Sequence, residues 1–250
     1  MPGIDRNSLI QIFIAEGGEK IGDWCVNKMG WRVNENDFPE NSDITIDFFP
    51  EKEKIFRSLE YVSPNTVKYL VLGQDPYPST RPIPGGGSTP DAIGIAFIVD
   101  SNDPCDFPSS LKPFIGNLLP QLGKDSPTFV EWVAANRVLL LNAALTVPQL
   151  RRNEKVRDVA SKHLKYWRKF TSSLVASVKL GSPTANLIAF GSEPRQVLCN
   201  GLEKAGCFSS CRHPTASSGN LQSFQDFWGK NKSGKELKRL ASLNDFVPTN

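Results

Sequence analysis

The chain has 250 residues, of which 39% are hydrophobic, so it can bury the core of one larger domain or of two small ones. It has no run of about 18 apolar residues and no basic segment before an apolar core at its start, so neither a membrane-spanning helix nor a secretory signal is expected. The net charge of +3 permits nucleic-acid binding but excludes a strongly basic, histone-like protein.

Helical and strand-like segments alternate along the chain. The pattern predicts N-terminal helices at residues 7–15, 21–28 and 51–60. Short apolar runs predict strands at residues 67–72, 94–99, 138–141 and 186–190, with 207–211 as a fifth. Amphipathic stretches predict further helices at residues 109–119, 128–135, 156–178, 193–204, 223–228 and 234–243. This alternation favours an α/β fold in which a mostly parallel sheet is covered by helices on both faces.

The stretch at residues 78–90, PSTRPIPGGGSTP, is rich in proline and glycine. These residues suit neither a helix nor a central strand, so a loop is predicted. The loop is longer than a usual connection, which indicates a functional or a mobile segment.

Polar side chains stand at the ends of several predicted strands. Asp75, Asn142, Ser192 and His213 each follow one of the apolar runs. In sheets of this kind, ligands bind beyond the carboxyl ends of the strands. The sequence therefore predicts that these side chains gather along one edge of the sheet.

The five cysteines are odd in number and irregular in spacing, which favours a reducing compartment over a disulfide framework. Cys207 and Cys211 are four residues apart, whereas a zinc site usually has a closer pair, with a second pair or histidines elsewhere. The two histidines are His163 and His213, and His163 is interpreted as a surface or structural residue. We therefore expect buried thiols, no metal site and no other cofactor.

Five short motifs follow one another along the chain. They are GQDPY (73–77), FPSSL (107–111), LLLNAALTV (139–147), FGSE (190–193) and HPTAS (213–217). Together and in this order they closely resemble the motifs of the family 1 uracil-DNA glycosylases, and the similarity runs from about residue 46 onward. The resemblance implies a three-layer α/β/α fold with a central, mostly parallel four-stranded sheet. It also implies a single domain, residues 1–250, in which residues 1–45 form an N-terminal helical extension.

The resemblance implies a hydrolase that flips uracil out of DNA and cleaves its N-glycosidic bond. Such cleavage builds positive charge on the sugar and negative charge on the departing base, so a carboxylate and a hydrogen-bond donor are needed. Asp75 would orient the attacking water and stabilise the cation, although an isolated Asp-Pro pair is also common in turns. His213 would donate to O2 of uracil as a neutral imidazole.

Four further residues would hold the base. Asn142 offers both a donor and an acceptor, which match O4 and N3 of uracil and not the pattern of cytosine. Phe97 would stack on the base, Tyr77 would fill the space that the 5-methyl group of thymine needs, and Gln74 would contribute backbone contacts. Taken alone, a phenylalanine in a strand and an asparagine after one are also ordinary structural residues.

The DNA backbone contacts that the resemblance implies come from small hydroxyl groups and nearby main-chain N–H groups. The serines concerned are Ser110, Ser192 and Ser217. Neutral donors of this kind can bind phosphates without a large basic patch. They would explain how a mildly basic protein binds DNA.

The chain departs from the family at three places. Pro78 stands where the family motif continues with a histidine, and the connection over residues 78–93 is longer than usual. Ser217 stands where the family has a leucine that wedges into the duplex. A serine cannot fill the vacated base stack, so weak flipping from duplex DNA and a relative preference for single strands are expected.

We interpret the protein as a monofunctional, monomeric uracil-DNA glycosylase of base excision repair that acts on single- or double-stranded DNA. It is expected inside the cell, in the cytoplasm of a prokaryote or in the nucleus in a eukaryotic or viral setting. The alternative is a DNA-binding replication-accessory protein on the same fold with weak or no glycosylase activity. The departures at Pro78, at Ser217 and in the long loop motivate it, whereas the presence of Asp75, Asn142, Tyr77 and His213 argues against it. A generic nucleotide-binding domain fits poorly, because the glycines at 85–87 form no phosphate-binding motif. A proteinaceous inhibitor or a replication partner is left open.

Overall fold

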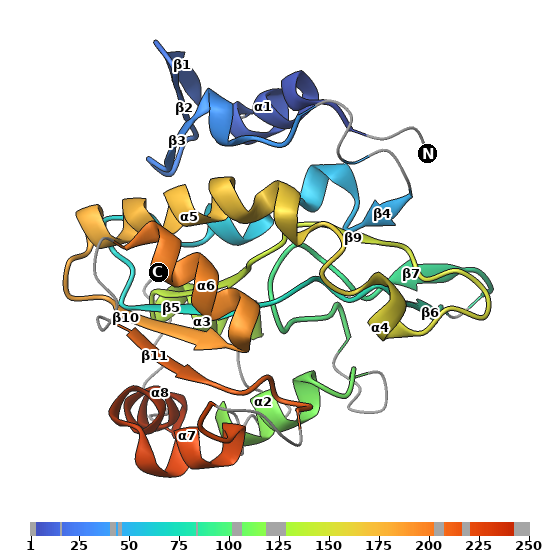
Figure 1. The fold of residues 1–250 in the computed structure, drawn as a ribbon, viewed down its shortest axis with the longest axis vertical. Coiled ribbons are helices and arrows are strands. Elements are labelled where there is room, and N and C mark those ends of the chain that lie inside the picture. The colour runs from blue at the N-terminus through green and yellow to red at the C-terminus, as the bar shows by residue number, and fades with distance from the viewer. Residues whose placement is uncertain are drawn as a thin grey trace.

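The computed structural model describes residues 4–15, 17–40, 44, 47–83, 85–101, 107–118, 129–202, 208–216 and 221–242. At its centre lies a four-stranded sheet in the order β11–β10–β5–β8 (Figure 1). Its strands are β5 (Tyr69–Gly73), β8 (Val138–Asn142), β10 (Asn186–Phe190) and β11 (Phe208–Cys211). All neighbouring pairs are parallel. The predicted α/β fold with a four-stranded sheet is confirmed.

Side chains of the central strands alternate between two separate cores. Leu70 and Leu72 enter the core beneath α5 (Leu164–Gly181), whereas Val71 enters the core that contains α7 (Phe224–Lys230). Successive side chains of a strand point to opposite faces, so a strand that is apolar at every position needs apolar cover on both. The molecule accordingly has three layers, helices on each side of the sheet.

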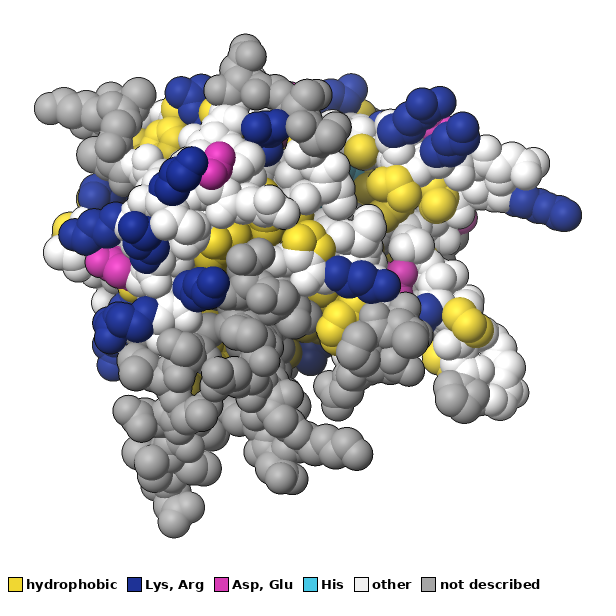
Figure 2. Space-filling model, turned by 90° about the horizontal axis from the view of Figure 1, so that it is seen from below, with side chains coloured by type: hydrophobic (Ala, Val, Ile, Leu, Met, Phe, Trp, Pro, Cys, Tyr) yellow, Lys and Arg dark blue, Asp and Glu magenta, His cyan; other side chains and the backbone are white. Residues whose placement is uncertain are grey.

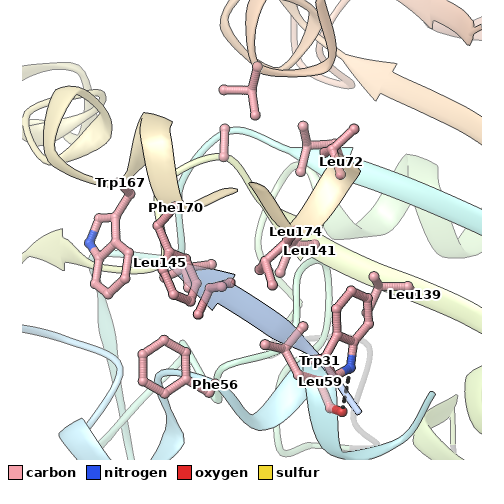
Figure 3. Close-up of a cluster of buried hydrophobic side chains, with 14 of the residues drawn as sticks. Trp31, Phe56, Leu59, Leu72, Leu139, Leu141, Leu145, Trp167, Phe170 and Leu174 are labelled. Carbon is pink, nitrogen blue, oxygen red and sulfur yellow. Dashed lines mark hydrogen bonds between the residues drawn. The ribbon is translucent and has the colours of Figure 1, made fainter. Parts of the chain in front are cut away.

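The larger core lies between the sheet and α5, and Figure 3 shows part of it. Trp167 and Phe170 project from α5 into this core, and both are fully buried. Trp31 is buried beside Leu59, and its indole N–H donates to the Leu59 carbonyl at 3.0 Å. Truncation of a buried aromatic residue such as Phe170 to alanine is expected to destabilise the fold by about 3–5 kcal/mol.

The N-terminal part is not the purely helical extension that the sequence predicted. Among the described residues before position 46, only α1 (Arg6–Ile14) is an α-helix, and a three-stranded antiparallel sheet follows it. Residues 21–28, predicted as a helix, belong to this sheet, whose strands are β1 (Glu19–Ile21), β2 (Trp24–Val26) and β3 (Arg32–Asn34). The reason is a two-residue hairpin turn at Gly22 and Asp23, where Gly22 has a φ of +57°.

The N-terminal part packs directly onto the main body of the molecule. Phe13 of α1 lies edge-to-face against Phe170 of α5, with ring centroids 5.8 Å apart. Ser177 of α5 donates to the carbonyl of Arg32 in β3 at 3.0 Å. These shared contacts support our proposal that residues 1–250 form one domain.

Residues 94–99, predicted as a strand, form a bend and a turn at residues 94–97 and no strand, and residues 95–99 are buried. Gly94 has a φ of +82° and Phe97 a φ of +61°, and neither value fits an extended strand. A Cβ atom at Gly94 would lie only 1.8 Å from the carbonyl oxygen of Lys54. The prediction was wrong because an apolar run does not distinguish a buried strand from a buried turn.

Residues 156–178, predicted as one helix, are divided in two. A single helical turn, α4 (Val156–Val159), is separated from α5 by a bend at Ser161, whose φ is +62°. The apolar residues keep a helical spacing across the bend, so the pattern does not reveal it. The helix predicted at residues 51–60 is likewise divided, into the 3₁₀ helices η2 (Lys52–Lys54) and η3 (Arg57–Glu60).

The predicted loop at residues 78–90 contains a β-hairpin. Its strands are β6 (Thr80–Pro82) and β7 (Ser88–Pro90), and Figure 1 shows it projecting from the body of the molecule. Asp91 anchors its base, because one carboxylate oxygen pairs with Arg81 at 3.1 Å and the other accepts from Ser79 at 2.6 Å. The described residues of the long connection therefore include a paired hairpin.

The remaining elements are η1 (Glu35–Asp37), β4 (Phe48–Phe49) paired with β9 (Val147–Pro148), α2 (Leu111–Leu118), α3 (Phe129–Ala135), α6 (Ser192–Gly201) and α8 (Lys232–Ser242). Of these, α2, α3, α6 and α8 match predicted helices where they are described, whereas η1, β4 and β9 were not predicted. The predicted element ends at residues 119, 128, 203–204, 207 and 243 lie outside the described residues. No helix in the described part of the chain has the length and hydrophobicity needed to cross a membrane.

Candidate active site

A pocket of about 490 Å³, counting its open mouth, lies at the carboxyl ends of β5 and β8. Seven of the nine site residues predicted from the sequence line it, namely Gln74, Asp75, Tyr77, Phe97, Ser110, Asn142 and His213. The eighth, Ser192, is exposed at the start of α6, and Ser217 lies outside the described residues. Of the four strand-end residues, Asp75, Asn142 and His213 share this pocket and Ser192 does not line it.

The two carboxylate oxygens of Asp75 have different surroundings. Oδ2 accepts hydrogen bonds from the Gln74 side chain at 2.9 Å and from the main-chain N–H of Ser161 at 3.0 Å. Oδ1 is buried and has no hydrogen-bond partner among the described residues. Because an unpaired buried acceptor is costly, such an atom points to a role with a ligand or a water molecule.

The pKa of Asp75 reflects its burial. Removal from solvent raises the pKa above its ordinary value of 3.8, and the hydrogen bonds from Gln74 and Ser161 offset part of this rise by stabilising the charged form. The fixed Oδ2 holds the orientation of the carboxylate, while Oδ1 remains available as a strong acceptor.

Ser161 is a site residue that sequence reasoning missed. Its hydroxyl accepts from the Gln74 amide at 3.0 Å, and its N–H binds Asp75. The left-handed φ of +62° aims this N–H, at a cost of about 1–3 kcal/mol for a residue other than glycine. No signal in the sequence marks this bend, because the helical pattern continues through it.

Gly73 brings Asn142 and Phe97 close to the end of β5. Gly73 is the register partner of Asn142 in β8. A Cβ atom at position 73 would lie 2.6 Å from Oδ1 of Asn142 and 2.9 Å from the Phe97 ring. Only glycine leaves room for both side chains here. The Phe97 ring is stacked on Phe114 with centroids 4.5 Å apart, which fixes its plane at the pocket wall.

Tyr77 and Ser110 meet at the pocket wall. The Ser110 hydroxyl donates to Oη of Tyr77 at 3.4 Å, and burial raises the pKa of Tyr77, which keeps the phenol neutral. Ser110 is only 9% exposed. Its hydroxyl is therefore turned toward Tyr77, and a contact with DNA at this position would fall to the main chain.

His213 has a defined tautomer. The main-chain N–H of Thr215 donates to Nδ1 at 3.4 Å, and the Thr215 hydroxyl lies 2.9 Å from the same atom. Because an N–H can only donate, Nδ1 is the acceptor and the imidazole proton is on Nε2. Burial lowers the pKa of His213, which favours the neutral ring. His213 therefore presents one N–H donor.

His163 is a structural residue, 3% exposed. Trp167 donates to the Thr146 hydroxyl at 2.7 Å, and this hydroxyl lies 2.9 Å from Nδ1 of His163. Burial lowers the pKa of His163 to about 4.

Metal-binding side chains do not cluster in the described parts of the chain. No three His, Cys, Asp or Glu residues there could hold a metal ion together. Cys25, Cys199 and Cys211 are free thiols, and Cys207 lies outside the described residues.

Comparison with known proteins shows which proteins this chain is related to. No family model matches the chain. A uracil-DNA glycosylase of Streptococcus sanguinis (strain SK36) is 29% identical over 203 residues, which are 80% of this chain and 78% of that protein. The chain is a divergent relative of the uracil-DNA glycosylases. The resemblance seen in its motifs is thus confirmed.

Solved uracil-DNA glycosylases share the fold. The mimivirus uracil-DNA glycosylase aligns with a TM-score of 0.55 and 22% identity, over 76% of this chain and 72% of that one. The enzyme of Nitratifractor salsuginis aligns with a TM-score of 0.51 and 23% identity, over 78% of this chain and 80% of that one.

Proposed function

We propose that this protein is a uracil-DNA glycosylase, a hydrolase that removes uracil from DNA and leaves an abasic site for base excision repair. One observation carries the proposal. The buried, unpaired Oδ1 of Asp75 lies in the same pocket as Asn142 and the neutral His213. An acceptor, an edge-reading amide and a neutral donor are the groups that uracil excision needs.

In this mechanism the bond between C1′ of the sugar and N1 of uracil breaks, and its electron pair leaves with the base. Oδ1 of Asp75 stabilises the positive charge on the sugar and accepts a hydrogen bond from the attacking water. Nε2–H of His213 donates to O2 of the departing base, where negative charge develops. Water supplies the hydroxyl group to C1′, and its remaining proton is released.

Base selection would come from the walls of the pocket. The Asn142 amide reads O4 and N3 of uracil, and cytosine presents the opposite donor and acceptor there. Tyr77, held by Ser110, occupies the space that a 5-methyl group would need. Phe97 supplies the stacking surface, and the Gln74 side chain contributes by orienting Asp75.

The substrate would be uracil-containing DNA, flipped into the pocket from a single or a double strand by a monomeric enzyme. Ser192, Ser217 and main-chain groups near Ser110 would contact the backbone, and the start of α6 supplies N–H groups of the kind that bind phosphate. A variant of the mimivirus enzyme has been solved in complex with UGI, so a protein inhibitor is a reasonable partner to test here. The enzyme would act inside the cell, where DNA is.

Incubation with a labelled oligonucleotide that contains one uracil tests the proposal. The reaction contains EDTA, and alkali then cleaves any abasic site. We expect strand cleavage with uracil and none with matched oligonucleotides that carry thymine or cytosine. DNA binding without cleavage would overturn the enzymatic proposal in favour of a replication-accessory protein.

A further inference from the structure

The pocket itself offers no cation to a DNA strand. None of the lining residues that the structure describes is Lys or Arg. A nucleotide flipped into the pocket brings a phosphate on each side, and phosphate contacts by Lys and Arg supply much of the affinity for DNA. Cationic side chains should therefore lie close to the pocket mouth.

The segment at residues 151–158, here called the cationic segment, carries cationic side chains of this kind. Arg151, Arg152, Lys155 and Arg157 all fall within seven residues, and all are exposed. In Figure 2, Lys and Arg side chains gather at the upper right, the end of the molecule at which Figure 1 places α4 and the β6–β7 hairpin.

Both ends of the cationic segment are fixed to the walls of the pocket. Before it, the main-chain N–H of Leu150 donates to the carbonyl of Pro78 at 3.0 Å, directly after Tyr77. After it, Val159 is buried in a small cluster with Ala92, which lines the pocket. Two residues farther on, the N–H of Ser161 holds Asp75.

The acidic residues of the segment shape its backbone. The Glu154 carboxylate accepts from the N–H of Arg151 at 2.9 Å, and the Asp158 carboxylate accepts from the N–H of Lys155 at 2.8 Å. Arg157 lies 3.6 Å from Asp158 as a solvent-exposed pair. Arg152 and Lys155 have no carboxylate partner among the described residues.

We propose that the cationic segment binds the phosphates of the DNA strand beside the flipped nucleotide, with Arg152 and Lys155 as its principal contacts. The proposal rests on the proposed function, because the phosphates must lie at the mouth of this pocket. It adds a backbone-binding element that none of the recognised motifs contains, and this element ends three residues before Ser161, which orients Asp75.

The α8 helix provides a matched control. Lys235 and Lys238 are also exposed, and they lie at the opposite end of the molecule from the cationic segment. Figure 2 shows a second group of Lys and Arg side chains toward that end. Replacement of these two residues removes the same charge without touching the pocket mouth.

The test measures the affinity for a fluorescein-labelled duplex without uracil by anisotropy, from about 50 to 200 mM salt. The variants are Arg152→Gln/Lys155→Gln, the control Lys235→Gln/Lys238→Gln, and the charge-retaining Arg152→Lys/Lys155→Arg. The logarithm of the binding constant falls linearly with the logarithm of the salt concentration, and each phosphate contact adds about 0.9 to the steepness of this line, here called the salt slope. Loss of two contacts should therefore reduce the salt slope by roughly 1.8. The wild-type affinity should then fall roughly 12-fold more over this range than that of the first variant.

The control and the charge-retaining variant should keep the wild-type slope. A wild-type slope in Arg152→Gln/Lys155→Gln, or an equal loss in the α8 control, would overturn the proposal. A charge-retaining variant that behaves like the glutamine variant would also overturn it, because charge would then not be the cause. Since this substrate contains no uracil, the result is independent of excision. If the wild type has a steeper salt slope than Arg152→Gln/Lys155→Gln but releases no uracil from a uracil-containing substrate, only the proposed function is refuted.

Discussion

The main-chain N–H of Ser161 donates a 3.0 Å hydrogen bond to Oδ2 of Asp75, although 86 residues separate the two in the sequence. The Gln74 side chain bonds to both of them, to Oδ2 at 2.9 Å and to the Ser161 hydroxyl at 3.0 Å. One oxygen of the carboxylate is thereby fixed from two directions. The orientation of Oδ1, and with it the position of a bound water, follows from this arrangement.

Loss of the Gln74 amide is expected to shift the pH dependence of uracil release. The amide stabilises the charged carboxylate, so Gln74→Leu should raise the pKa of Asp75 beyond the rise that burial already causes. Activity requires the ionised form, so the acid limb of the profile of kcat/KM against pH should move to higher pH.

Gln149→Leu is the matched control, because the Gln149 amide bonds to the carbonyl of Phe48. It should leave the acid limb in place. An acid limb that does not move in Gln74→Leu would show that this hydrogen bond does not act on the titrating group.

Asn142→Asp is expected to change base selection. In the variant the amide donor is lost, and a carboxyl group can pair with the amino group of cytosine. We expect the ratio of uracil to cytosine release to fall by roughly 10- to 100-fold, as one or two hydrogen bonds of about 1–3 kcal/mol are exchanged. Asn136→Asp, at a position where the side chain bonds to the carbonyl of Trp132, should leave the ratio unchanged. An unchanged ratio in Asn142→Asp would refute the edge-reading role.

His163 is expected to make the fold sensitive to acid. Its pKa in the folded state is about 4, below the ordinary value of 6.5, so the unfolded chain binds the proton more readily. The contribution of neutral His163 to the stability of the fold is therefore fully present above pH 6.5. It is lost as the pH falls from there through about 4. The difference in pKa corresponds to roughly 3 kcal/mol.

Urea unfolding at neutral and at acid pH measures this contribution. His163→Gln, which can still hydrogen-bond to the Thr146 hydroxyl, should lose less stability between the two conditions than the wild type. An equal loss in both proteins would mean that His163 titrates normally in the folded state.

The rate of uracil release should also depend on whether the DNA substrate is single-stranded or double-stranded. Ser217, which lies outside the described residues, stands where the relatives' motif has an apolar wedge, so opening a duplex should be inefficient. We expect faster uracil release from a single strand than from a duplex of the same sequence under single-turnover conditions. Ser217→Leu should narrow the gap, and equal or faster release from the wild-type duplex reaction would contradict the expectation.

Much of the site could be predicted from the sequence, because its side chains follow buried strands. Asp75, Asn142 and His213 meet because the carboxyl ends of β5, β8 and β11 lie on one edge of a parallel sheet. Apolar runs of this kind are a strong local signal for buried strands. Because the strands are parallel, the residues that follow them lie at the same edge of the sheet.

What the sequence did not reveal depends on single backbone conformations. The bend at Ser161 and the turn at Phe97 are both left-handed, with φ values of +62° and +61°. Neither residue is a glycine, so no local signal marks the change of direction. Tertiary contacts hold both conformations, such as the hydrogen bonds to Asp75 and the stacking on Phe114.

Single-turnover release of uracil by Asp75→Asn is the most direct test of the proposed function. The variant keeps the shape of the side chain and an acceptor for Ser161 but removes the negative charge. We expect the rate to fall by about 10²–10⁴-fold, while the folded state at neutral pH is as stable as the wild type or more so, because a buried charge is removed. A rate within a few-fold of the wild type, in a variant that folds, would contradict the central role of Asp75.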